Sequence, residues 1–164
     1  MALMPSLNPR IVDALYAESL ALAEAVRARF DQLRREVTAA SGDTAIADAA
    51  GGEDLLRVQI SCEGLRTTTR VMHCLGWLLN HRAYFAGELS ELQLRRHGRL
   101  IANFPMNDPA STALLPPDLR RLVHESERLY ERIQRLERAW RGEPQPGIRA
   151  IDKVRQRVAT RIGS

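Results

Sequence analysis

Two cysteines and two histidines lie close together in the middle of this 164-residue chain and could form a metal site: Cys62, His73, Cys74 and His81. On a helix, Cys74 and His81 share a face but lie about 10 Å apart at 1.5 Å per residue, and Cys62 and His73 are farther apart. Zinc needs four ligands around one point, at roughly 2.0–2.3 Å. We therefore predict no metal site, and interpret these residues as buried thiols and hydrogen-bonded histidines.

A serine and a histidine, Ser126 and His124, could suggest nucleophilic catalysis. Ser126 falls on an apolar helical seam, where its hydroxyl is expected to bond back to the carbonyl of Leu122. The chain has no Gly-x-Ser-x-Gly motif and no glycine-rich phosphate loop. We predict that the protein is not an enzyme and needs no cofactor.

Basic residues concentrate in the last part of the chain, behind the proline- and glycine-rich break that starts at Glu143. The formal net charge is +4, and the residues from Arg149 onward account for all of it. Apolar residues recur at helical spacing between these bases, but so short a helix is marginal alone in water. We predict a flexible basic tail over 143–164 that binds a partner through Arg149, Ile151, Lys153, Val154, Arg155, Arg157, Val158 and Arg161.

A second basic cluster, Arg95–Arg99, is short and has no aromatic residue on which a base could stack. The charged residues between 120 and 141 are of both signs, which is typical of a solvated helix face. Nucleic-acid binding through the tail and Arg95–Arg99 is therefore the alternative, and protein binding is favoured.

The elements that position these residues are predicted to be helices, because apolar residues recur alternately three and four positions apart. Asn8 suits the N-cap of the first helix and Gly87 the end of the second. The expected fold is all-α: an antiparallel three-helix bundle of long helices with a short extra helix and the flexible tail. The bundle covers residues 1–142, with helices over about 9–39, 54–86, 90–103 and 117–141.

The second long helix is expected to supply the centre of the core. Its apolar seam consists of Leu55, Val58, Cys62, Leu65, Thr69, Met72, Gly76, Leu79, Ala83 and Ala86. From Val71 to Leu79 the chain is apolar nearly all the way round, and such a segment must be enclosed by other helices. Trp77 lies within this segment and is predicted to be buried.

The sequence contains no segment typical of export or membrane insertion. The N-terminus lacks the basic and apolar regions of a secretory signal. The longest apolar run is about half of what a bilayer span requires. We expect a soluble, cytoplasmic protein.

The central stretch resembles a family of small proteins typified by the regulator of CtrA degradation, RcdA. The residues that carry the resemblance are Thr68, Thr69, Arg70, Met72, Trp77, Leu78, Leu79, Arg82, Ala83, Gly87 and Glu88. Supporting matches in the flanking helices are Leu15–Tyr16, Ser19–Leu20, Phe30, Leu129–Tyr130, Arg132–Ile133 and Arg135–Leu136. Together they span roughly residues 9–141.

This resemblance implies a three-helix bundle, often dimeric, that works as a protein–protein adaptor. The type member helps to deliver substrates to the ClpXP protease during the bacterial cell cycle. The partners implied here are the protease, its adaptor complex or a client protein, and a homodimer is compatible with the resemblance.

Overall fold

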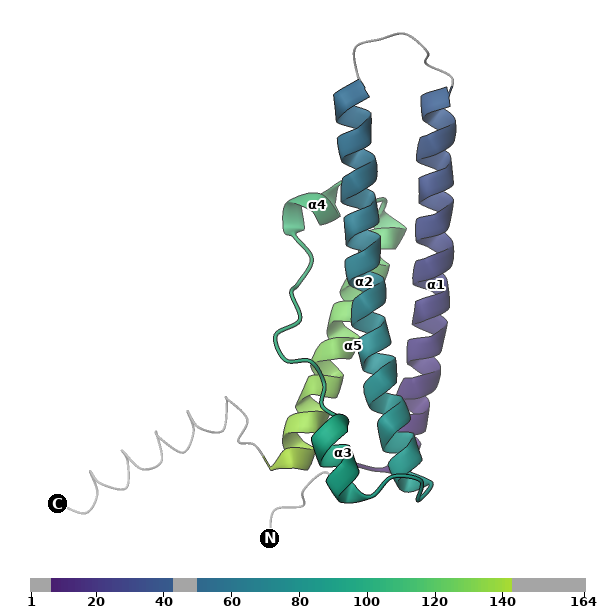
Figure 1. The fold of residues 1–164 in the computed structure, drawn as a ribbon. Coiled ribbons are helices and arrows are strands. Elements are labelled where there is room, and N and C mark those ends of the chain that lie inside the picture. Colours follow the sequence, from purple (N-terminus) through teal and green to yellow (C-terminus); the bar gives the residue numbers. More distant parts are fainter. Residues whose placement is uncertain (1–6, 43–49, 143–164) are drawn as a thin grey trace, which may run out of the picture.

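A computed structural model describes residues 7–42 and 50–142, and every regular element in those ranges is a helix (Figure 1). The predicted all-α class is confirmed. The helices are α1 (Pro9–Gly42), α2 (Ala50–Phe85), α3 (Glu91–His97), α4 (Pro109–Ala113) and α5 (Pro117–Arg141). The predicted basic tail lies outside the described residues. Within them, no helix is long and apolar enough to cross a membrane.

The helix ends follow local sequence signals. At the start of α1, the side chain of Asn8 accepts a hydrogen bond from the backbone N–H two residues on. Ser90 and Gln93 form a reciprocal capping box at the start of α3. Gly87 and Gly142 have positive φ angles of 77° and 70°, which glycine adopts without strain just beyond a helix. The predicted roles of Asn8 and Gly87 are confirmed.

The long helices α1, α2 and α5 contact one another pairwise, with α1 and α2 side by side (Figure 1). Ion pairs join Arg29 to Asp118 and Arg132 to Glu18 (2.9 Å), so α5 runs opposite to α1. The chain after α2 passes through α3 and α4 before α5 begins. This return path lets α5 run in the same direction as α2 (Figure 1).

The core lies where the apolar faces of α1 and α5 meet α2. Val12, Val26, Leu119 and Ile133 have no exposed surface, and each is flanked by further buried core residues of its own helix. A Cβ atom at Gly64 of α2 would lie 2.9 Å from the ring of Phe30. Glycine at this position therefore allows α2 to approach α1 closely.

The seam predicted to turn α2 toward the core faces outward instead. Leu65 is 70% exposed, Met72 57% and Leu79 48%. The buried face of α2 includes the polar residues Glu63, Thr67, Arg70 and His81. The prediction was wrong because apolar periodicity selects the most apolar stripe, whereas this helix buries polar side chains that pair with one another.

The segment between α3 and α4 also departs from the prediction. A helix was expected over 90–103, but α3 ends at His97 and residues 98–108, here called the strap, run along α2 and α5 without regular structure. The backbone N–H of Leu100 donates to the Glu137 carboxylate (2.9 Å) rather than to a helical carbonyl. Side-chain partners on α5 thus replace the helical hydrogen bonds at this point.

Candidate functional site

Arg70 is the centre of a buried polar network between α2, α5 and the strap. Its side chain has no exposed surface, and it donates to Ser126 Oγ (2.8 Å) and to the carbonyl of Pro105 (3.0 Å). The Glu127 carboxylate lies 3.9 Å from the guanidinium. Burial lowers the pKa of Arg70, and the charge of Glu127 opposes that shift.

Asn107 connects the end of the strap to the same network. Its side-chain amide donates to the carboxylate of Glu63 and to Thr67 Oγ1 (3.3 Å), and its backbone N–H donates to Glu127 (3.2 Å). Glu63 also accepts from Arg66 at 2.9 Å. A buried carboxylate is costly unless it is paired, so these contacts compensate the burial of Glu63 and Glu127.

Tyr130 holds the middle of the strap to α5. Its hydroxyl donates to the carbonyl of Ile101 and accepts from the N–H of Phe104 (3.3 Å). The ring of Phe104 in turn lies 5.4 Å from the guanidinium carbon of Arg70. The described polar residues in this region therefore fasten the strap to the long helices, and their partners are other parts of the fold.

An aromatic cluster occupies the other end of α2. The rings of Trp77 and His81 stack at 3.7 Å, and Trp140 of α5 meets His81 edge-on at 5.4 Å. His81 Nδ1 lies 2.8 Å from the Trp77 carbonyl and must carry the proton, because a carbonyl only accepts. Burial lowers the pKa of His81 to about 4. Trp77 is 2% exposed, so its predicted burial is confirmed.

The cysteines and histidines considered for a metal site are separated. Cys74 is buried, and its burial raises the pKa of the thiol to about 12. Cys62 is exposed, which corrects its interpretation as a buried thiol. Across the residues that the structure describes, no three His, Cys, Asp or Glu side chains are grouped so that they could hold a metal ion.

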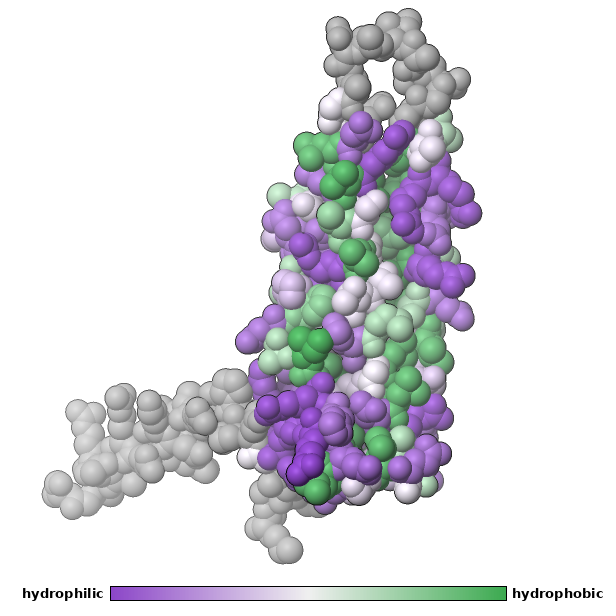
Figure 2. All heavy atoms as spheres, viewed as in Figure 1, coloured by the Kyte–Doolittle hydropathy of each residue, from purple (hydrophilic) through white to green (hydrophobic). Residues whose placement is uncertain are grey.

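The candidate interaction surface is the outward face of α2, here called the α2 seam: Leu55, Val58, Cys62, Leu65, Thr69, Met72, Gly76, Leu79, Ala83 and Ala86. Its large members are between 48% and 70% exposed. Figure 2 shows hydrophobic side chains at several heights on the face that carries α2. Contiguous exposed apolar surface is what distinguishes interaction sites from singly scattered apolar residues, so the α2 seam is the candidate site.

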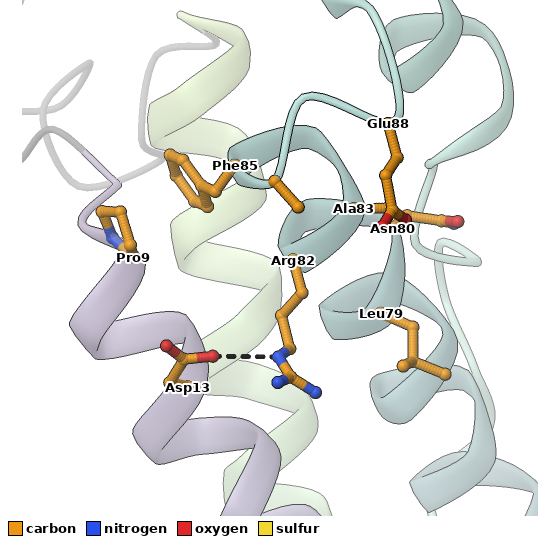
Figure 3. Close-up of a pocket in the computed structure, with 9 residues that line it drawn as sticks. Pro9, Asp13, Leu79, Asn80, Arg82, Ala83, Phe85 and Glu88 are labelled. Atoms are coloured by element: carbon orange, nitrogen blue, oxygen red, sulfur yellow. Dashed lines mark hydrogen bonds and ion pairs between the residues drawn. The ribbon is translucent and has the colours of Figure 1, made fainter.

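A groove of about 640 Å³ lies at the lower end of the α2 seam, between α1 and α2. Leu79 and Ala83 line it together with Pro9, Phe85 and Glu88. In Figure 3, Arg82 and Asp13 point toward one another across one side of it, and their ion pair is 2.9 Å long. The Arg82 guanidinium also lies over the ring of Tyr16, at 4.4 Å from its centroid.

The residues that carry the family resemblance divide between the interior and this surface. Arg70, Trp77 and Leu78 are buried. Leu79, Arg82, Ala83 and Glu88 line the groove, while Thr68 and Met72 border a second hollow between α1 and α2. Thr69 is half-buried, with its hydroxyl bonded to the carbonyl of Leu65 (2.7 Å), and Gly87 ends α2.

The basic cluster Arg95–Arg99 is partly engaged within the fold. Arg95 pairs with Glu91 (2.9 Å), and its guanidinium carbon lies 4.7 Å from the ring centroid of Trp140. Arg96 and His97 are exposed. The eight tail residues proposed to bind a partner lie outside the described residues.

Sequence reasoning missed the buried polar network. Ser126 was expected to bond to Leu122, but its hydroxyl donates to the carbonyl of Val123 (2.6 Å) and accepts from Arg70. One signal was present: Arg70 borders the segment that is apolar all the way round, and an arginine in such a place needs buried partners. The partners of Arg70 on the strap could not be predicted, because the strap is irregular and apolar periodicity predicts the position of helices and strands only.

The sequence model of the family described as "Protein of unknown function (DUF1465)" matches residues 3–162, and the chain belongs to that family. No curated protein and no solved structure matches the chain.

Proposed function

We propose that this member of the DUF1465 family is a non-enzymatic protein–protein adaptor of the cytoplasm. Its three long helices serve as an antiparallel bundle, a rigid scaffold, and its basic tail over 143–164 captures a partner. The resemblance to the RcdA-like family extends the proposal to the delivery of substrates to the ClpXP protease. The tail suits such a role, because a short basic amphipathic segment can fold against an acidic, apolar groove.

The observation that carries this proposal is the exposed α2 seam. A soluble helix normally turns its apolar stripe inward, and the second apolar stripe of α2 has no cover among the described residues. Buried polar side chains between α2 and α5 bind the strap, as the bonds of Arg70 to Pro105 and of Asn107 to Glu63 illustrate. The exposed seam and the engaged polar side chains therefore support a role in protein contact rather than in catalysis.

The proposal is tested by binding of the purified full-length chain to immobilised ClpX, the unfoldase of the protease. We expect retention that persists at high salt, because apolar docking is less salt-dependent than phosphate binding. A labelled DNA duplex is the parallel probe. Binding to DNA that collapses with salt, without retention on ClpX, would instead favour the nucleic-acid function of the tail and Arg95–Arg99.

A further inference from the structure

We propose that a cavity between the end of α5 and the first half of the strap binds a small phosphate monoester. The cavity has a volume of about 320 Å³ and lies where the last two turns of α5 meet residues 99–103. The end of α3 lies beside the same end of α5 (Figure 1), and Arg141 Nη1 donates to the carbonyl of Arg95 at 3.4 Å. This inference goes beyond the proposed function and does not depend on the adaptor role or on the tail.

Arginine side chains give the cavity its charge. Arg99 lines it from the strap, and Arg138 and Arg141 line it from α5. The one acidic residue among its described lining is Glu137, which is 8% exposed. Its Oε1 already accepts from the N–H of Leu100 (2.9 Å) and from Arg141 Nε (3.1 Å). Because this carboxylate is engaged within the fold, the lining keeps an excess of positive charge for a ligand.

Arg141 is held in place before any ligand binds. Its side chain is 11% exposed, with Nε bonded to Glu137 and Nη1 to the carbonyl of Arg95. Its guanidinium carbon also lies 5.6 Å from the ring centroid of Trp140. A guanidinium has five N–H donors, so donors remain after these two bonds. An arginine that is already fixed loses little side-chain entropy when it binds an anion, and its planar fork fits phosphate oxygens.

Arg138 supplies a second cation from the same face of α5. It precedes Arg141 by three residues and follows Gln134 by four, and side chains at these spacings are neighbours on a helix. Arg138 and Gln134 are half-buried, and both line the cavity. From the strap, Asn103 adds a second side-chain amide to the lining. Guanidinium and amide N–H groups of two separate elements therefore surround one space.

This set of donors suits a phosphate monoester better than a carboxylate. A phosphate monoester carries close to two negative charges at neutral pH and three acceptor oxygens, whereas a carboxylate has one charge and two oxygens. Several cations from separate elements match the larger number of acceptors. Ile101, which is 48% exposed, and Ala102 also line the cavity. They offer apolar surface to the organic part of an ester.

The dimensions of the cavity favour a small molecule over a nucleic-acid strand. Its volume is at the lower end of the range for small-molecule pockets, which is roughly 300–1,000 Å³. None of the described residues that line it is aromatic, whereas proteins hold single strands by stacking bases on aromatic rings. The ring of Trp140 nearby is occupied by the guanidinium of Arg95 at 4.7 Å. A ligand of the size of a sugar phosphate therefore fits best.

The dipole of α5 is a competing reason for the same bases. Cations are favoured near the C-terminus of a helix, and Arg138 and Arg141 both lie in the last turn of α5. The dipole accounts for their charge, but it does not require a cavity that Arg99 of the strap helps to line. Only a binding site gives saturable uptake of phosphate, whereas bases that serve the dipole alone attract anions weakly and without selectivity.

The proposal is tested by isothermal titration calorimetry of the full-length chain at constant ionic strength. The probes are glucose 6-phosphate, inorganic phosphate and glucose. We expect saturable binding of glucose 6-phosphate at one site per chain, weaker binding of inorganic phosphate and no binding of glucose. Equal affinity for the ester and for inorganic phosphate would overturn the assignment of an ester.

Arg138→Gln should weaken the binding of glucose 6-phosphate about tenfold, because it removes one charge-assisted hydrogen bond. Arg138→Lys keeps the charge without the planar fork and should bind with intermediate affinity. Arg135→Gln is the matched control, since it removes the same charge from an exposed position of α5 that is not among the residues lining the cavity. Equal weakening by Arg138→Gln and Arg135→Gln would show a diffuse charge effect and overturn the proposal.

The basic tail is a second place where phosphate could bind, and a full-length variant separates it from the cavity. This variant replaces five bases with Gln: Arg149, Lys153, Arg155, Arg157 and Arg161. Glucose 6-phosphate should still bind to it, and the amide NMR signals of residues 99–103 and 134–141 should shift on binding. Loss of binding in this variant, or no saturable binding to the unchanged chain, would overturn the proposal, while retention on ClpX would test the adaptor function separately.

Discussion

Arg70 of α2 donates a hydrogen bond of 2.8 Å to the hydroxyl of Ser126 on α5, and neither residue has any exposed surface. The bond joins two helices that run in the same direction, and the second guanidinium nitrogen reaches the strap at Pro105 (3.0 Å). One side chain thus fixes three separate parts of the chain.

Removal of Arg70 should therefore be strongly destabilising. Arg70→Ala removes the arginine partner of the buried Glu127 and Ser126, and breaking a buried pair typically costs about 3–5 kcal/mol. Urea unfolding measures the loss. Arg132→Ala is the control, because its ion pair with Glu18 is half-exposed and is expected to contribute less than about 1 kcal/mol. Equal effects of the two substitutions would show that the Arg70 network does not stabilise the fold.

Trp77 should be a large contributor to core stability. It is 2% exposed and stacks on His81, so Trp77→Ala should cost about 3–5 kcal/mol. Leu92, 60% exposed on α3, provides a comparison: Leu92→Ala should stay within about 0.5 kcal/mol. A urea midpoint that Trp77→Ala leaves unchanged would contradict the placement of this side chain.

Stability should fall as the pH drops from about 6.5 toward 4. Burial lowers the pKa of His81 from 6.5 to about 4, so the unfolded chain binds a proton in this window and the folded chain does not. Proton uptake by the unfolded state alone favours unfolding, by up to roughly 3 kcal/mol at the acid end.

The control is His81→Phe, which keeps an aromatic ring against Trp77 and cannot titrate. The difference in unfolding free energy between the unchanged chain and this variant, followed from pH 7 to pH 4.5, isolates the histidine from the carboxylates. A difference that does not change with pH would mean that His81 titrates equally in the folded and unfolded states.

Cys74 should be inert in the folded protein. It has no exposed surface, and its thiol pKa is raised to about 12 by burial. In a Cys62→Ser background, a maleimide should label Cys74 only after urea unfolding, because the thiolate is the reactive form. Rapid labelling of the native protein at pH 8 would be inconsistent with a closed core around α2.

The tail should capture its partner through both apolar and charged side chains. Changing Ile151, Val154 and Val158 to Ser removes the apolar stripe and keeps every charge. Changing Arg149, Lys153, Arg155, Arg157 and Arg161 to Gln does the reverse. Adaptor function requires both variants to bind ClpX more weakly, with the apolar variant impaired even at high salt. If only the variant that lacks the basic side chains binds more weakly, the tail binds by charge alone, as expected for nucleic acid.

The sequence predicted the helical class, because apolar residues recur three and four positions apart along each long helix. It failed on α2, where apolar residues occupy both faces and polar residues such as Arg70 and His81 occupy the interior. The enclosure that the pattern predicts around Val71–Leu79 is incomplete, because Met72 and Leu79 are exposed. The strap was not predictable, because its place depends on single contacts such as Tyr130 with Ile101.

The most direct test of the adaptor function is the rate at which purified ClpXP degrades CtrA, the client that the family resemblance suggests, in the presence of this chain. An adaptor raises the effective concentration of a client at the protease, so degradation at low client concentration should accelerate and then saturate as the full-length chain is added. The tail variant without its apolar stripe should give no acceleration. Degradation that is unchanged at every concentration of the chain would contradict protease delivery of this client.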